Sequence, residues 1–206
     1  MNQKTLMEDV DYIKTLAQEG ADTPLLGGRF GIMWGCLTVI ALITHWATLT
    51  GRFPLQPANI GLIWMMYGIT GSVLTGILGR MLKNKPGCYS VSNRVEQAVW
   101  VGTTIMIFTL AIAIAISVTL SGRPVILFDM IMPTAFGVYF LNYFAIASLS
   151  GQKSLRVPAF ISLLTMVITL NLIGDPLIYL VSALGVIFAG IVPSLIFLKN
   201  EPSDVV

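Results

Sequence analysis

Apolar residues fill six long stretches of the chain, and charged residues gather in the gaps between them. A helix needs about 20 consecutive apolar residues to cross the hydrocarbon core of a bilayer. A membrane β-barrel would instead show shorter segments of alternating polarity. We therefore predict an all-α fold, a polytopic membrane bundle of six transmembrane helices. The predicted helices cover residues 30–50, 59–79, 98–120, 125–148, 157–173 and 177–198.

Polarity divides the chain into three segments. Residues 1–28 form a polar, acidic arm, residues 29–199 hold the six apolar stretches, and residues 200–206 form a short tail. A secretory signal peptide has a basic start followed by a short apolar stretch. Because the arm is acidic, we expect the first helix to stay in the mature protein.

Lys and Arg residues predict the orientation of the helices. Ten of the 12 lie near the chain ends or in loops on one side of the predicted bundle, and only Arg52 and Arg123 lie on the other. Loops rich in Lys and Arg remain in the cytoplasm. Both termini are therefore predicted to be cytoplasmic.

The arm carries a stripe of apolar residues. Leu6, Val10, Ile13 and Ala17 follow spacings of four, three and four, which marks one face of a short amphipathic helix. Its polar face is acidic, whereas helices that bind membrane surfaces are usually basic. We expect the stripe to contact a partner protein or the chain's own basic loop at residues 80–85. Simple docking of the arm beneath the bundle is the alternative.

Three predicted outer turns have similar sequences, at 48–54 (TLTGRFP), 119–124 (TLSGRP) and 169–176 (TLNLIGDP). Gly and Pro occur in any tight turn. The shared Thr-Leu and Gly-Arg pairs nevertheless favour three related helical hairpins, each entering from the cytoplasm.

Two local signals concern helix ends and bends. Asn93 followed by Glu96 resembles an N-cap with an acid at the third position, and it predicts the start of the third helix. Pro133 and Pro193 fall inside the fourth and sixth helices, where proline is expected to cause kinks.

Small residues four positions apart offer packing surfaces on the first two helices. Such residues let helix backbones approach closely inside a membrane. The pattern fits packing within one bundle, and formation of a homo-oligomer through the same faces is the alternative. The candidate packing residues are Gly31, Gly35, Gly68, Ser72 and Gly76.

Polar residues at membrane depth are the usual indication of function. His45 and Asp129 lie at similar depths near the outer ends of the first and fourth helices, so we expect an outer-side polar pair if these helices are neighbours. Such a pair could respond to external pH. Pairing of Asp129 with Arg123, or its hydration, is the alternative. Asn142 and Asn171 are expected to form hydrogen bonds between helices.

Several chemistries are disfavoured by composition. The predicted helices contain no lysine for a retinal Schiff base, and one histidine with two cysteines is too few for a buried zinc or haem site. No Gly-rich phosphate loop is present, and a net charge of +2 does not indicate a nucleic-acid partner. We expect no enzyme activity, no catalytic residue, no cofactor and no metal.

Three segments carry a resemblance to a known group. Residues 16–20 (LAQEG), 24–28 (PLLGG) and 93–100 (NRVEQAVW) resemble an uncharacterised group of small bacterial six-helix inner-membrane proteins. The resemblance implies a bacterial inner membrane and no particular chemistry.

Two classes of function remain open. The first is a non-enzymatic accessory, scaffold or sensor protein that engages a partner through its cytoplasmic arm. The second is a small transporter or channel, alone or as an oligomer. The first is favoured because a transporter is expected to carry polar residues on several helices near the membrane midplane.

Overall fold

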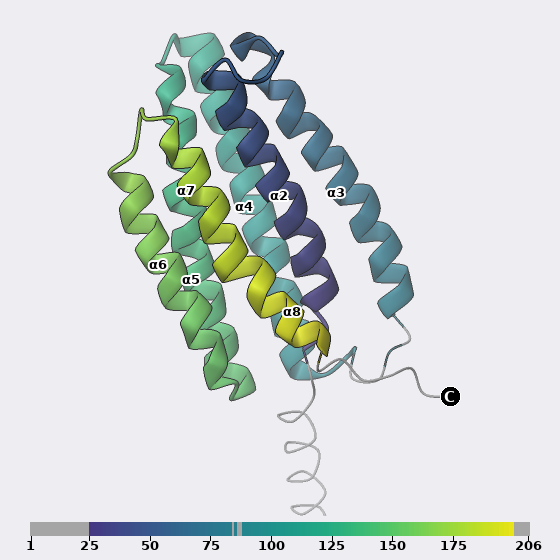
Figure 1. Cartoon of the computed structure of the whole chain (residues 1–206). Helices are drawn as coiled ribbons and strands as arrows, with labels where there is room; N and C mark the ends of the chain where they lie inside the picture. The colour runs from purple at the N-terminus through teal and green to yellow at the C-terminus, as the bar shows by residue number, and fades with distance from the viewer. Residues whose placement is uncertain (1–24, 84, 86–87, 200–206) are drawn as a thin grey trace, which may run out of the picture.

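The computed structural model describes residues 25–83, 85 and 88–199, and these residues form helices joined by short turns. In this part of the chain six helical segments are long and apolar enough to cross a membrane. They confirm the all-helical prediction with six such segments, and they indicate a multi-pass membrane protein. The segments alternate in direction (Figure 1). We call the end of the bundle at Gly28 and Lys199 the proximal end, and the opposite end the distal end.

Short helices of three to six residues interrupt or precede some of the long ones. The elements in chain order are α2 (Gly28–Leu49), η1 (Pro57–Asn59), α3 (Ile60–Leu82), α4 (Val91–Ser121), η2 (Val125–Met130), α5 (Ile131–Ser150), η3 (Lys153–Leu155), α6 (Arg156–Leu170), α7 (Leu177–Val186), η4 (Ile187–Ile191) and α8 (Val192–Lys199). All the η elements are 3₁₀ turns except η4, which is a π-helical turn.

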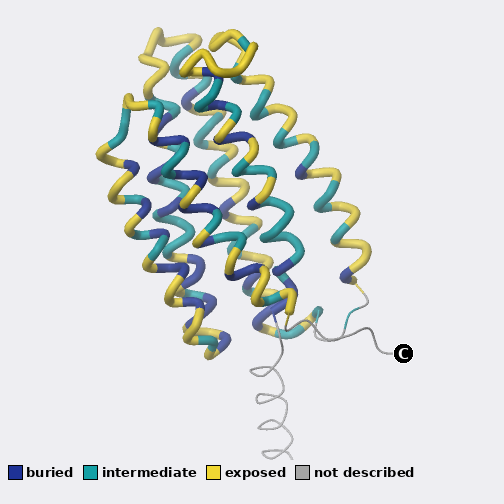
Figure 2. Tube along the Cα trace, viewed as in Figure 1, coloured by how far each residue is buried: buried dark blue, intermediate teal, exposed yellow. Residues whose placement is uncertain are grey.

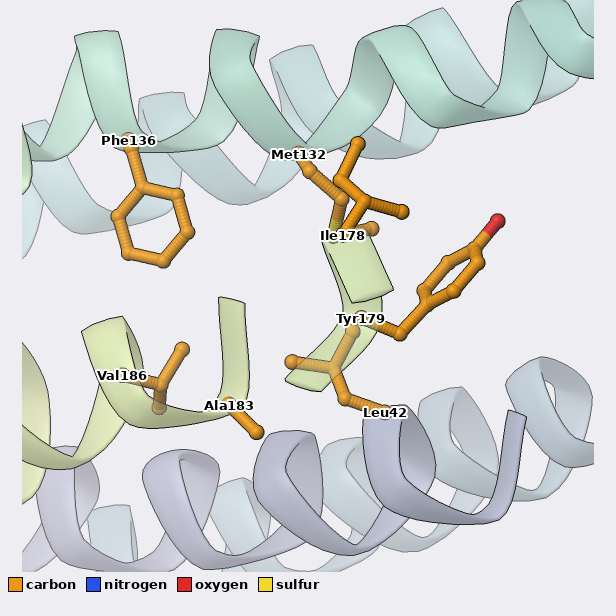
Figure 3. Packing of buried hydrophobic residues seen from close by; sticks show 7 residues of the cluster. All are labelled: Leu42, Met132, Phe136, Ile178, Tyr179, Ala183 and Val186. Carbon is orange, nitrogen blue, oxygen red and sulfur yellow. The ribbon is translucent and has the colours of Figure 1, made fainter. Parts of the chain in front are cut away.

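The centre of the bundle is built around α7. This helix packs against α2 on one side and against α5 and α6 on the other. Figure 3 shows Leu42 of α2, Phe136 of α5 and Ile178 of α7 among the side chains that meet there. In contrast, α3 and α4 keep largely exposed outer faces (Figure 2). Apolar residues dominate these faces, as lipid contact requires.

A second, proximal core contains a residue from outside the helices. Leu25 is 2% exposed and packs with Tyr143 and Ile146 of α5 and with Ala159 of α6. The chain therefore passes through the proximal core before it enters α2.

The start of α4 differs from the prediction. The N-cap is Ser90, whose hydroxyl accepts a hydrogen bond from the Asn93 amide, so α4 begins at Val91, before both the predicted cap at Asn93 and the apolar stretch that starts at residue 98. Asn93 and Glu96 are buried within the first turns of α4. The helix therefore begins earlier than hydropathy indicated, because these polar side chains find buried partners.

Both internal prolines lie where the helix type changes. Pro133 is in the first turn of α5, directly after the 3₁₀ turn η2, and Pro193 follows the π-helical turn η4. Proline has no amide hydrogen and its ring clashes with the carbonyl four residues earlier. A wider or tighter turn before the ring accommodates both effects.

The glycines of the three distal turns share one backbone feature. Gly51, Gly122 and Gly174 have φ angles of 71°, 62° and 89°, in the left-handed region that favours glycine. Each turn thus needs glycine for its own geometry, whether or not the three turns belong to related hairpins.

Candidate functional site

Near the distal end, side chains from several helices form a polar cluster. We define the distal cluster as His45 of α2, Trp64 of α3, Asp129 of η2 and Tyr179 of α7. His45, Asp129 and Tyr179 are each at most 8% exposed. The cluster therefore joins four elements through buried polar groups.

Asp129 holds two parts of the distal end together. Its Oδ1 accepts a hydrogen bond from the Tyr179 hydroxyl at 2.5 Å, and its Oδ2 accepts one from the Gly174 amide at 2.9 Å. Arg123 is exposed, and the described residues give it no ion pair with Asp129. The carboxyl group thus fixes the turn between α6 and α7 to η2.

His45 is held between two aromatic residues. Its ring lies 3.8 Å from that of Tyr179, between centroids, with the planes tilted by 33°. The Trp64 Nε1–H donates a hydrogen bond to His45 Nδ1 at 3.2 Å. Because an indole nitrogen can only donate, Nδ1 must carry a lone pair, so this geometry requires a neutral imidazole with its proton on Nε2.

The predicted pair of His45 and Asp129 is connected through Tyr179. The structure forms no direct hydrogen bond between the two side chains, because α7 lies between α2 and α5. The sequence analysis found the two ionisable residues but missed Trp64 and Tyr179. Aromatic residues are common in apolar helices, and only their similar depth to His45 and Asp129 could have indicated them.

A second polar cluster lies at the proximal end. We define the proximal anchor as Asn93 and Glu96 of α4, with the backbone amides that they bind. Asn93 Oδ1 accepts from the Leu26 amide at 2.8 Å, and Glu96 Oε2 accepts from the Gly27 amide at 3.2 Å. Asn93 was predicted to be the N-cap of α4, but the N-cap is Ser90. Asn93 and Glu96 instead bind the chain segment that leads into α2.

Hydrogen bonds also join α2 to α3 along their length. Trp34 Nε1 donates to Thr75 Oγ1 at 3.0 Å, and the hydroxyl groups of Thr38 and Tyr67 share a hydrogen bond at 3.1 Å. Together with the bond between Trp64 and His45, these contacts form a seam that we call the α2–α3 seam. The α3 partners run backwards along the sequence as the α2 residues run forwards, as in any antiparallel helix pair, and sequence analysis did not detect this pairing.

The two predicted asparagines behave differently. Asn142 is buried in α5 and donates from Nδ2 to Thr103 Oγ1 of α4 at 2.6 Å, with Trp100 packed edge-on against Tyr139 and Tyr143 nearby. Asn171 is exposed at the distal end of α6 and donates to the Val167 carbonyl of its own helix. The two amides therefore do not line a shared polar surface.

The candidate packing glycines fall into two groups. A Cβ atom on Gly35 would lie 2.6 Å from Ile191 Cγ1, and one on Gly31 would overlap the Ser194 hydroxyl. On α3, the close approach is at Gly71, against the Trp34 ring. Gly68 makes ordinary contact with Phe108, Gly76 has no neighbour within 4 Å, and Ser72 is exposed.

The apolar stripe of the arm, Leu6, Val10, Ile13 and Ala17, lies outside the described residues. Within the part of the chain that is described, no group of three or more His, Cys, Asp or Glu residues could hold a metal ion. The distal cluster instead contains an imidazole and a carboxyl group, which are groups that can bind and release protons. The proximal anchor can hold the segment that leads into α2.

Comparison of the chain with protein-family models, with curated proteins and with solved structures found no match.

Proposed function

We propose that the chain is a non-enzymatic accessory or sensor protein of the bacterial inner membrane that engages a partner protein through its arm, residues 1–28. Both termini lie in the cytoplasm, and the helices form three hairpins. The Lys and Arg distribution supports the orientation, since eight of the ten Lys and Arg residues in the described part of the chain lie at the proximal end and only Arg52 and Arg123 lie at the distal end (Figure 1).

The observation that carries this proposal is the way in which the base of the arm is held. Leu25 and Leu26 are 2% and 7% exposed, and the Leu26 and Gly27 amides bind Asn93 and Glu96. Burying one leucine side chain contributes about 1.5–3 kcal/mol, and a typical hydrogen bond adds about 0.5–1.5 kcal/mol. An arm attached by a free linker would need none of these contacts.

The anchor gives the arm a defined exit from the bundle. Glu96 and Asn93 lie on the first turns of α4, directly after the loop that contains Lys83 and Lys85, with Arg80 in the last turn of α3 before it. A partner that binds the arm would therefore meet this loop as well. Movement of α4 would also be passed to the base of the arm through the anchor.

The distal cluster is the observation that favours the alternative, a small transporter or channel. Buried His45 and Asp129 are residue types that occur on ion pathways. In this bundle, however, their bonds connect helices and a turn, and the other buried ionisable side chain, Glu96, belongs to the opposite end of the described structure. This spacing supports the accessory or sensor function over transport.

The proposed function is tested by affinity purification in mild detergent. We expect the wild-type chain to recover one or more specific proteins, and Ile13→Asp on the apolar stripe to lose them. Glu8→Gln on the polar face should retain them, because it leaves the stripe intact. Equal recovery with Ile13→Asp and wild type would contradict the proposal, and a proteoliposome flux of ions or solutes would favour the alternative.

The anchor is tested separately through Glu96. Glu96→Leu removes the acceptor for the Gly27 amide, so we expect recovery of the partner to fall and the arm to become more accessible to protease. Glu96→Gln keeps an acceptor oxygen and should behave like the wild type. If both variants preserve recovery and protease resistance, the anchor does not position the arm.

A further inference from the structure

The helix α3 depends on α2 for its place in the bundle. Among the described helices, α2 is the one against which α3 packs extensively, and the outer face of α3 is exposed (Figures 1 and 2). Three side-chain hydrogen bonds of the α2–α3 seam support this contact. A change in one of them therefore acts on a helix that has few other attachments.

The three bonds differ in what can break them. The bonds from Trp34 to Thr75 and from Thr38 to Tyr67 join an indole and hydroxyl groups. These groups keep their protons throughout the range from pH 8 to pH 3.5. The distal bond is different, because its acceptor is the Nδ1 atom of His45. An imidazole can take up a proton within this range.

Protonation of His45 is incompatible with the bond to Trp64. The Trp64 indole nitrogen is a donor only, and a doubly protonated imidazole is also a donor at both nitrogens. A proton on Nδ1 would make two N–H groups face each other, with only 3.2 Å between Trp64 Nε1 and His45 Nδ1. The ring or the indole must then move, and the distal bond of the seam is lost.

The distal cluster contains a carboxyl group that can attract a protonated His45. Tyr179 stacks on the imidazole and donates to Asp129, so the nearest carboxyl group lies on the side of His45 that faces α7. The indole of Trp64 lies on α3. Protonation therefore favours the contact with α7 and η2 and weakens the contact with α3.

We propose that His45 is a proton-operated switch that releases the distal half of α3 from α2. The switch works from the distal side, because His45 lies in the last turns of α2, which ends at Leu49 at that end of the bundle. It does not depend on the arm or on a partner protein. The titratable and charged groups that face or surround it are Tyr67 on α3, Tyr179 on α7, Asp129 on η2, and Arg52, Arg123 and Asp175 on the distal rim.

The test is NMR of the full chain in lipid nanodiscs, with ¹⁵N-labelled indoles. The chain has four Trp residues, and the Trp64 signal is assigned by its loss in Trp64→Phe. From pH 8 to pH 3.5, we expect the Trp64 Nε1–H signal to lose its downfield, hydrogen-bonded shift. The Trp34 signal serves as an internal control, because its acceptor is the hydroxyl of Thr75, and it should not move.

His45→Gln is the matched variant, because a glutamine oxygen can accept the Trp64 bond but cannot titrate. Its Trp64 signal should stay constant across the same pH range. Protection factors of the distal α3 amides, which correct for the intrinsic pH dependence of hydrogen exchange, should fall several-fold at low pH in the wild type and stay constant in His45→Gln.

Three results would overturn the switch. The first is a Trp64 signal that does not change with pH in the wild type. The second is the same titration in His45→Gln, which would assign it to another group. The third is a titrating Trp64 signal with unchanged protection factors in the distal half of α3, which would show that the helix is not released.

Discussion

At the scale of single residues, glycines set how closely α2 approaches α8 and the π-helical turn. A Cβ on Gly28 would lie 2.8 Å from both the Leu198 amide nitrogen and the Ser194 carbonyl oxygen, which are backbone atoms. Backbone atoms cannot rotate away as the end of a side chain can. Gly76, in contrast, has open space around it.

These surroundings predict opposite effects of the same substitution. Gly28→Ala should destabilise the fold by about 1–3 kcal/mol, the usual effect of overpacking. Gly76→Ala should be neutral or stabilising by about 0.5–1 kcal/mol, because alanine favours a helix over glycine. Unfolding in mixed detergent micelles, followed by tryptophan fluorescence, measures both. Equal effects of the two variants would contradict this view of the packing.

Tyr179 carries a second prediction at this scale. Tyr179→Phe removes the hydroxyl and leaves Asp129 Oδ1 buried without its donor. An unsatisfied buried group costs about 1–3 kcal/mol, so stability should fall by about that amount in the same assay. Tyr89 is 70% exposed, and Tyr89→Phe should change stability by less than about 0.5 kcal/mol.

The distal cluster also shows what single residues reveal before a fold is known. His45 and Asp129 were predicted as a pair because ionisable residues are rare at membrane depth. Their connection through Tyr179 could not be predicted, since it depends on α7 passing between α2 and α5. The sequence indicates how deep a residue lies along its own helix, but it does not indicate which helices are neighbours, and side-chain contact depends on both.

At the scale of elements, the α2–α3 seam is the main support of α3. Removing two of its bonds with Thr75→Val and Tyr67→Phe together should loosen α3 before the rest of the bundle. Hydrogen bonds between helices in membranes contribute about 0.6 kcal/mol on average and up to about 1.7 kcal/mol. We therefore expect faster hydrogen exchange in α3 by several-fold, with α7 unchanged.

A paired control uses the same chemical changes elsewhere. Thr104→Val with Tyr89→Phe removes a hydroxyl that bonds to its own helix and one that is exposed. Exchange in α3 should then match the wild type. Loosening that spreads equally over α3 and α7 in the seam variant would mean that α3 is not held by the seam alone.

Helix positions were largely predictable, and their ends were predictable where hydropathy changes sharply. The first helix was predicted over residues 30–50, and α2 covers Gly28–Leu49. The third apolar stretch was predicted from residue 98 with a helix cap at Asn93, whereas the cap is Ser90 and α4 begins at Val91. The burial of Asn93 and Glu96 could not be predicted, because their partners, the Leu26 and Gly27 amides, are almost 70 residues away in sequence.

At the scale of the whole molecule, topology relates the proximal and distal ends to the two sides of the membrane. Reporters that are active only outside the cytoplasm should be active when fused after Arg52 or Arg123. They should be inactive when fused after Lys85, Lys153 or Val206. The charge asymmetry predicts this result. Activity of the fusion at Val206 would reverse the orientation of the distal cluster as well as that of the arm.

The π-helical turn η4 has a consequence for how α2 and α8 recognise each other. A π-helical turn holds one residue more than an α-helical turn, and one residue corresponds to about 100° of rotation around a helix axis. The turn therefore acts as a phase shift between α7 and α8. With this shift, Ala183 of α7 and Ser194 of α8 both face inward, the latter toward Gly31. Deleting Gly190 would remove the extra residue together with the π-helical turn, so Ser194 should keep its place opposite Gly31, whereas a regular α-helix of the present length would rotate Ser194 away from α2 by about 100°.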